Sequence, residues 1–243
     1  MMNTIFTLSQ LVHISAGALA LVLFWMPAML KKGSANHSRF GRYYVYAMYT
    51  VAATGVAMAT TGLIDPLAVI KQPAASADAL AAQIANRQNA WIFLIYISLL
   101  TLVTVRHGVL VLRYKAQRQQ LKSPLHLSLM LSLTLLGPVM AIWGYQEKLI
   151  LAMIFGLLGT TVGAGFLRYS VKATLTKLEW WIEHLGAMIG SGIACYTAFF
   201  AFGGSRLFID HGNLRLLSWT LPSVIGFVVI RYLSGKYQRR FAD

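Results

Sequence analysis

Hydrophobic residues gather into seven long segments, and polar connections separate these segments. A helix needs about 20 mostly apolar residues to cross the hydrocarbon core of a bilayer. The segments that meet or approach this length are residues 5–30, 43–63, 91–112, 125–143, 148–167, 180–202 and 216–233. The pattern predicts one all-α domain over residues 1–243, built as a bundle of seven transmembrane helices.

The connections divide the basic residues unequally between the two sides of the membrane. Fifteen of the 21 Lys and Arg residues fall on one side, namely Lys31, Lys32, Arg39, Arg42, Arg113, Lys115, Arg118, Lys122, Arg168, Lys172, Lys177, Arg231, Lys236, Arg239 and Arg240. Five fall on the other side, namely Lys71, Arg87, Lys148, Arg206 and Arg215. Basic residues accumulate in the cytoplasmic connections of membrane proteins. We therefore expect a multi-pass protein of a bacterial cytoplasmic (inner) membrane, with its N-terminus outside and its C-terminus in the cytoplasm.

The composition agrees with a membrane protein and excludes several other classes. Hydrophobic residues make up 57% of the chain and charged residues 12%, whereas soluble domains have about 45–50% and about 25%. The net charge of +14 follows from the topology and favours the lipid bilayer and its anionic head groups as partners. No nucleic-acid-binding module is present. The composition is also compatible with an oligomer or with a partner in a membrane complex. The sequence contains no recognisable enzyme motif, so whether the protein is an enzyme stays open.

Once the connections and the helix ends are assigned to the two sides, two charged residues remain within the predicted helices, and a histidine follows each of them directly. These dipeptides are Arg106-His107 and Glu183-His184. Charges within spanning helices are costly and usually face the bundle interior or a water-filled cavity. At 1.5 Å per residue, both histidines lie roughly 7–9 Å from the basic side. An Arg106–Glu183 ion pair with both imidazoles close by is therefore expected.

Three interpretations of these dipeptides remain open. In the first, His107 and His184 are ligands of a b-type haem or a transition metal, and Arg106 pairs a haem propionate. In the second, Arg106 and Glu183 line the polar site of a carrier for a small solute or for protons, and the histidines titrate near neutrality. In the third, the protein is an accessory subunit in which these residues are structural, with Arg106 reaching toward the lipid head groups.

Two further histidines are candidates for chemistry. His13 lies in the outer third of the first predicted helix, with Gly17 four residues later. It is either a hydrogen-bonded residue of a helix-packing groove or a candidate ligand of a separate outer cofactor or metal site. His37 lies in the first basic connection between Gly33 and Gly41, where the loop could hold a lipid phosphate or fold back under the bundle.

The remaining expectations concern helix packing and the longest connection. Residues 64–90 are expected to be either a plain linker or a connection that contains a short surface helix near 76–84, after an N-cap at Ser76. Glycines spaced along the segments 148–167 and 180–202 form small-xxx-small faces, so we expect these two helices to pack closely against each other.

The stretch from His13 to Met48 resembles the opening of an uncharacterised family of predicted seven-helix bacterial membrane proteins. The matching features are His13-x-x-x-Gly17, Lys32-Gly33, His37 and Gly41-Arg42-x-Tyr44. The stretch from Glu183-His184 to Phe199 is similar to the same group. The resemblance implies a fold and a membrane location but no reaction, and it makes a shared role of His13 and His37 more plausible.

Overall fold

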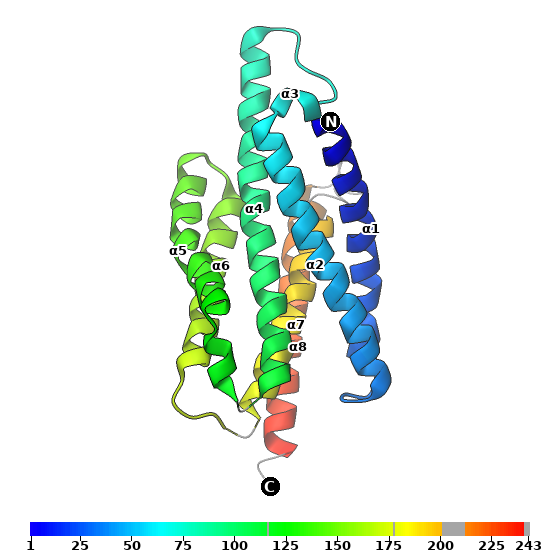
Figure 1. Cartoon of the computed structure of the whole chain (residues 1–243), viewed down its shortest axis with the longest axis vertical. Helices are drawn as coiled ribbons and strands as arrows, with labels where there is room; N and C mark the ends of the chain where they lie inside the picture. Colours follow the sequence, from blue (N-terminus) through cyan, green and yellow to red (C-terminus); the bar gives the residue numbers. More distant parts are fainter. Residues whose placement is uncertain (116, 177, 201–211, 241–243) are drawn as a thin grey trace.

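The computed structural model describes residues 1–115, 117–176, 178–200 and 212–240. Every regular element in these ranges is helical, which confirms the all-α class (Figure 1). The elements are α1 (Met2–Met29), α2 (Ala35–Ile64), α3 (Pro66–Val69), α4 (Ala77–Tyr114), the 3-10 helix η1 (Arg118–Lys122), α5 (Pro124–Gln146), α6 (Ile150–Val171), α7 (Glu179–Ala198) and α8 (Gly212–Arg240). Residues 201 and 202, expected at the end of the sixth segment, lie outside the described ranges.

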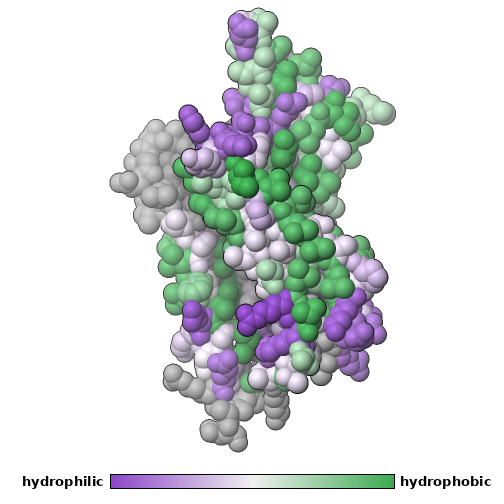
Figure 2. All heavy atoms as spheres, turned by 90° about the vertical axis from the view of Figure 1, so that its left-hand side faces the viewer, coloured by the Kyte–Doolittle hydropathy of each residue, from purple (hydrophilic) through white to green (hydrophobic). Residues whose placement is uncertain are grey.

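Within the described residues, five helices, α1, α2, α4, α5 and α6, are long and apolar enough to cross a membrane. Large apolar side chains stand on the outside of the bundle; Val22 is 66% exposed and Leu157 is 61% exposed. Figure 2 shows apolar side chains over the middle of one face and hydrophilic ones toward its two ends. Apolar area left in water is unfavourable by about 25 cal/mol per Å², so a surface of this kind belongs in lipid. The chain is a membrane protein.

Helix α4 lies at the centre of the bundle and packs against α2, α5, α6 and α7. α1 pairs with α2 and α5 pairs with α6, each as an antiparallel hairpin, while α7 lies against α1, α4 and α8. The α1–α2, α4–α5 and α6–α7 connections lie together at the bottom of Figure 1, near the end of α8. We call this the basic end, because it carries Lys32, Lys172 and Lys236. The N-terminus lies at the opposite end.

Residues 76–84 form neither the separate short helix nor the plain linker expected there. Helix α4 begins at Ala77, where the Ser76 hydroxyl accepts a hydrogen bond from the Ala79 amide, and continues without interruption for 38 residues. The physical reason is the absence of any glycine or proline between residues 77 and 107, so nothing stops the helix before the membrane segment. The first turns of α4 project beyond the neighbouring helices (Figure 1).

The glycine-rich face of α6 packs on α5, not on α7 as expected. A Cβ atom placed at Gly156 would lie 2.6 Å from the Gly137 carbonyl oxygen and 2.7 Å from the Ala141 nitrogen, so the two backbones are in direct contact. In α7, by contrast, Gly186 and Gly190 have open space where a Cβ would stand. The tight turn between α5 and α6 explains the pairing, since residues joined by a short connection form neighbouring antiparallel helices.

Candidate functional site

His107 and Glu183 come together at the contact between α4 and α7. The His107 Nε2 atom lies 3.0 Å from the Glu183 Oε1 atom. The imidazole is fully buried, whereas the carboxylate side chain is 25% exposed. Gly108 allows this approach, because a Cβ atom there would lie 2.9 Å from the Ala187 Cβ atom of α7. A carboxylate at the protein surface is thus bonded to an imidazole in the interior.

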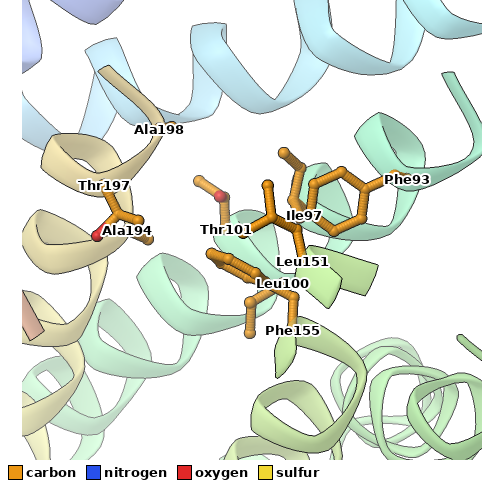
Figure 3. A pocket seen from close by; sticks show the side chains of 9 residues that line it. All are labelled: Phe93, Ile97, Leu100, Thr101, Leu151, Phe155, Ala194, Thr197 and Ala198. Carbon is orange, nitrogen blue, oxygen red and sulfur yellow. The ribbon is translucent and has the colours of Figure 1, made fainter. Parts of the chain in front are cut away.

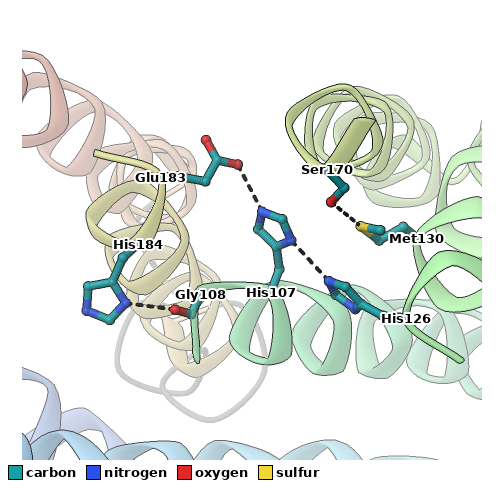
Figure 4. A network of polar contacts seen from close by, with 7 residues as sticks. All are labelled: His107, Gly108, His126, Met130, Ser170, Glu183 and His184. Carbon is teal, nitrogen blue, oxygen red and sulfur yellow. Dashed lines mark hydrogen bonds and ion pairs between the residues drawn. The ribbon is translucent and has the colours of Figure 1, made fainter. Parts of the chain in front are cut away.

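The second ring nitrogen of His107 meets another histidine, which sequence reasoning missed. The His107 Nδ1 atom lies 3.2 Å from the Nε2 atom of His126, a fully buried residue in the first turn of α5. The His107 ring also stacks on Phe166 of α6, with ring centroids 4.0 Å apart. Figure 4 shows His107 between Glu183 on one side and His126 on the other. We call Glu183, His107 and His126 the histidine chain.

His126 is not among the residues singled out from the sequence, because it stands at the start of its helix. Its depth in the membrane could have placed it near His107. The helices α4 and α5 meet at the basic end, so a residue in the first turn of α5 lies level with the last turns of α4. Its Nδ1 atom is buried and has no hydrogen-bond partner in the part of the chain that the structure describes. Unpaired buried polar atoms are uncommon and call for an explanation.

Arg106 does not form the expected ion pair with Glu183; His107 takes that position. Successive residues of a helix project about 100° apart, so Arg106 leaves α4 in a different direction from His107. The Arg106 Nε atom is buried, and no described residue forms a hydrogen bond with it. Its charge acts on Tyr49 of α2 and on His126.

His184 points away from the histidine chain. Its Nδ1 atom lies 2.8 Å from the Gly108 carbonyl oxygen, and Figure 4 shows Glu183 and His184 leaving α7 in different directions. The structure therefore does not bring His107 and His184 toward one shared ligand. Among the residues that the structure describes, no group of three or more His, Cys, Asp or Glu side chains is placed to hold a metal ion.

The remaining histidine candidates occupy two other places. The His13 Nδ1 atom in α1 lies 3.0 Å from the Thr54 Oγ1 atom in α2. His37 belongs to the first turn of α2 rather than to a loop, since Ser34 caps the helix and accepts a hydrogen bond from the His37 amide. The expected shared role of His13 and His37 has no contact to support it.

A polar groove opens beside Glu183 at the basic end. It measures about 240 Å³, and its lining residues come from α6, α7 and the connection between them: Gly165, Arg168, Tyr169, Lys172, Glu179 and Glu183. Lys172 forms an ion pair with Glu179. Partial burial would raise the pKa of the Glu179 carboxyl group, but hydrogen bonds from Lys172 and Thr176 outweigh it and lower that pKa. Glu183 is the member of the histidine chain that faces this groove.

A second, smaller cavity of about 40 Å³ lies among α4, α6 and α7 (Figure 3). Its lining is almost entirely apolar, with Phe93, Leu100 and Phe155 contributing the largest side chains. None of the candidate site residues borders it, so it belongs to the packing of the bundle rather than to the site.

No protein-family model, curated protein or solved structure matches this chain. Membership of the uncharacterised seven-helix family therefore stays a prediction. The function has to be argued from the histidine chain and the groove beside it.

Proposed function

We propose that this protein transfers protons within the membrane through the histidine chain, as a carrier that couples proton movement to the passage of a small solute. The observation that supports the proposal most directly is the position of His107. It is fully buried, and its two ring nitrogens bond a groove-facing carboxylate on one side and a second buried imidazole on the other. Ionisable groups inside membrane helices commonly form proton relays of this kind.

The proposed setting is a seven-helix bundle in a bacterial inner membrane. Helices α7 and α8, with 20 and 29 residues, supply the sixth and seventh spans. The basic end then faces the cytoplasm, as basic connections do, and the N-terminus faces outside. In this orientation the polar groove opens toward the cytoplasm, and the histidine chain runs from it across the bundle, from α7 through α4 to α5.

Proton transfer along the chain follows from the chemistry of imidazole, which can accept at one nitrogen while it donates at the other. A proton from the groove first neutralises the Glu183 carboxylate. It then passes to His107 Nε2, while the proton on His107 Nδ1 passes to His126 Nε2. Glu183 is again a carboxylate, His107 is again neutral, and His126 carries a proton on each nitrogen. His126 Nδ1 has no hydrogen-bond partner among the described residues, and it is the position from which a water or solute molecule would accept the proton.

The same contacts give less support to a haem held by His107 and His184. An axial ligand needs a free ring nitrogen aimed at the iron, but both nitrogens of His107 are already hydrogen-bonded, and His184 points elsewhere. The arrangement favours the carrier over this haem site.

Infrared difference spectroscopy on the protein in lipid bilayers tests the proposal. Stepwise acidification should produce a protonated-carboxyl band that disappears in Glu183→Gln. In proteoliposomes containing a pH-sensitive dye, an imposed pH gradient should drive a proton flux that falls about tenfold or more in Glu183→Gln and in His107→Asn, because each removes a proton-transfer step.

Glu179→Gln is the matched control. It removes a carboxyl group from the same groove but leaves the histidine chain untouched, so the flux should persist. A flux that survives Glu183→Gln, or a Glu183 carboxyl group that never changes protonation, contradicts the proposal. Variants that lose only stability would favour the accessory-subunit interpretation.

A further inference from the structure

His37 and His184 share an arrangement that the histidine chain does not use. The His184 Nδ1 atom lies 2.8 Å from the Gly108 carbonyl oxygen, and the His37 Nδ1 atom lies 3.0 Å from the Pro27 carbonyl oxygen. A carbonyl oxygen can only accept, so each Nδ1 atom must carry a proton and donate it. In the neutral ring the lone pair is then on Nε2. Both rings are half-buried.

The two residues also occupy equivalent positions on two parallel helices. Helices α2 and α7 both begin at the basic end and run away from it (Figure 1). Farther along, the Tyr44 hydroxyl of α2 lies 2.9 Å from the Ser191 hydroxyl of α7. His37 precedes Tyr44 by seven residues, and His184 precedes Ser191 by seven. Seven residues are about two helical turns, so both histidines lie on the faces that this hydrogen bond joins, two turns nearer the basic end.

The surroundings agree with this placement. His37 and Lys32 lie close enough to His184 to interact with it electrostatically. The Lys32 ammonium group donates hydrogen bonds to the Pro27 and Ala28 carbonyl oxygens, each at 2.7 Å. These carbonyls belong to the last turn of α1, where the helix dipole favours a positive charge. Lys32 is therefore held against α1.

We propose that His37 and His184 bind a divalent transition-metal ion through their Nε2 atoms, at the basic end between α2 and α7. Histidines that bind metals almost always donate their other ring N–H to a carbonyl or carboxylate, which fixes the tautomer and the ring orientation. Imidazole suits zinc, copper and nickel ions. Since no third His, Cys, Asp or Glu joins the pair within the described residues, water or a small solute completes the coordination, and the ion remains open to exchange.

Metal titration of the full-length protein in nanodiscs, without a polyhistidine tag, tests the site. Equilibrium dialysis should show one Zn²⁺ ion bound per chain, and His37→Ala or His184→Ala should each weaken this binding about tenfold or more. With Cu²⁺, electron paramagnetic resonance of the unmodified protein should show coupling to imidazole nitrogens from two residues. This spectrum does not depend on whether a variant folds.

His13→Ala is the matched control, because it removes an imidazole from the same bundle at a different place and should leave Zn²⁺ binding unchanged. His107→Asn should also leave it unchanged, while it abolishes proton transfer, so failure of the metal site and failure of the proposed function give different results. Absence of Zn²⁺ binding, equal affinity in His184→Ala, or a Cu²⁺ spectrum without imidazole nitrogens overturns the proposal.

Discussion

Replacing Gly156 by alanine should push α5 away from α6. Because α5 carries His126, the displacement should also disturb the histidine chain. The added Cβ atom would stand 2.6 Å from the Gly137 carbonyl oxygen and 2.7 Å from the Ala141 backbone nitrogen. Ordinary contacts of a Cβ atom begin near 3.4 Å, so the two helices must separate by about 0.8 Å at this point, because neither backbone atom can rotate away in a close-packed interior. His126 lies on the displaced helix, and its bond to His107 should lengthen.

The magnitude follows from two opposed contributions. Overpacking of a close contact costs about 1–3 kcal/mol, whereas alanine is a better helix former than glycine by about 0.8–1.0 kcal/mol. Gly165→Ala, in the same helix, gains the same propensity but has no atom within 4 Å of its Cβ position. The free energy of unfolding of Gly156→Ala should therefore lie about 1–3 kcal/mol below that of Gly165→Ala.

Reversible unfolding by SDS in mixed micelles, followed by circular dichroism, measures this difference. Both variants gain the same helix propensity, so the difference between their free energies of unfolding reports the contact with α5 alone. Equal stability of Gly156→Ala and Gly165→Ala would show that the α5 and α6 backbones are not in contact, and the packing argument would be refuted.

Three further predictions follow from individual contacts. Tyr44→Phe removes the buried hydrogen bond to Ser191 and should lower the free energy of unfolding by about 0.5–1.5 kcal/mol, measured in the same micelle assay. His126→Leu leaves a buried imidazole nitrogen of its neighbour unpaired and should cost about 1–3 kcal/mol, and an unchanged unfolding curve would contradict the contact. The pKa of Glu179 is lowered in the folded state because its hydrogen bonds, mainly from Lys172, outweigh the effect of partial burial. Its stabilising effect should therefore be complete above the usual carboxyl pKa and disappear as the pH falls through the lowered value, and Glu179→Gln should remove this pH dependence of unfolding.

Apolar runs and charge predict the helices of this protein well, because length and hydropathy are local properties. The segments near residues 5–30 and 125–143 correspond to α1 and α5 within a few residues. Partners of helices are less predictable, since a glycine face shows that a close contact exists but not which helix makes it. The glycines of α6 therefore suggested α7 until the structure showed α5.

The candidate site was predictable in part for the same reason. The positions of His107 and Glu183 within their predicted helices indicate that they lie at a similar depth, and the structure brings these two residues into contact. Which neighbour in each dipeptide would point inward depends on helix rotation, and this decided that His107 rather than Arg106 meets Glu183. The contribution of His126 depends on the packing of α5 against α4, which no local pattern reveals.

The length of α4 offers a practical route to imaging this protein. At 38 residues the helix is about 57 Å long, whereas the hydrocarbon core is about 30 Å thick, so its first turns must stand clear of the lipid. Small membrane proteins lack a rigid external feature by which particles can be aligned in electron cryo-microscopy. A designed helical scaffold fused in phase to the N-terminal turns of α4 would be fixed rigidly to the helix that carries His107, and would provide such a feature without altering either proposed site.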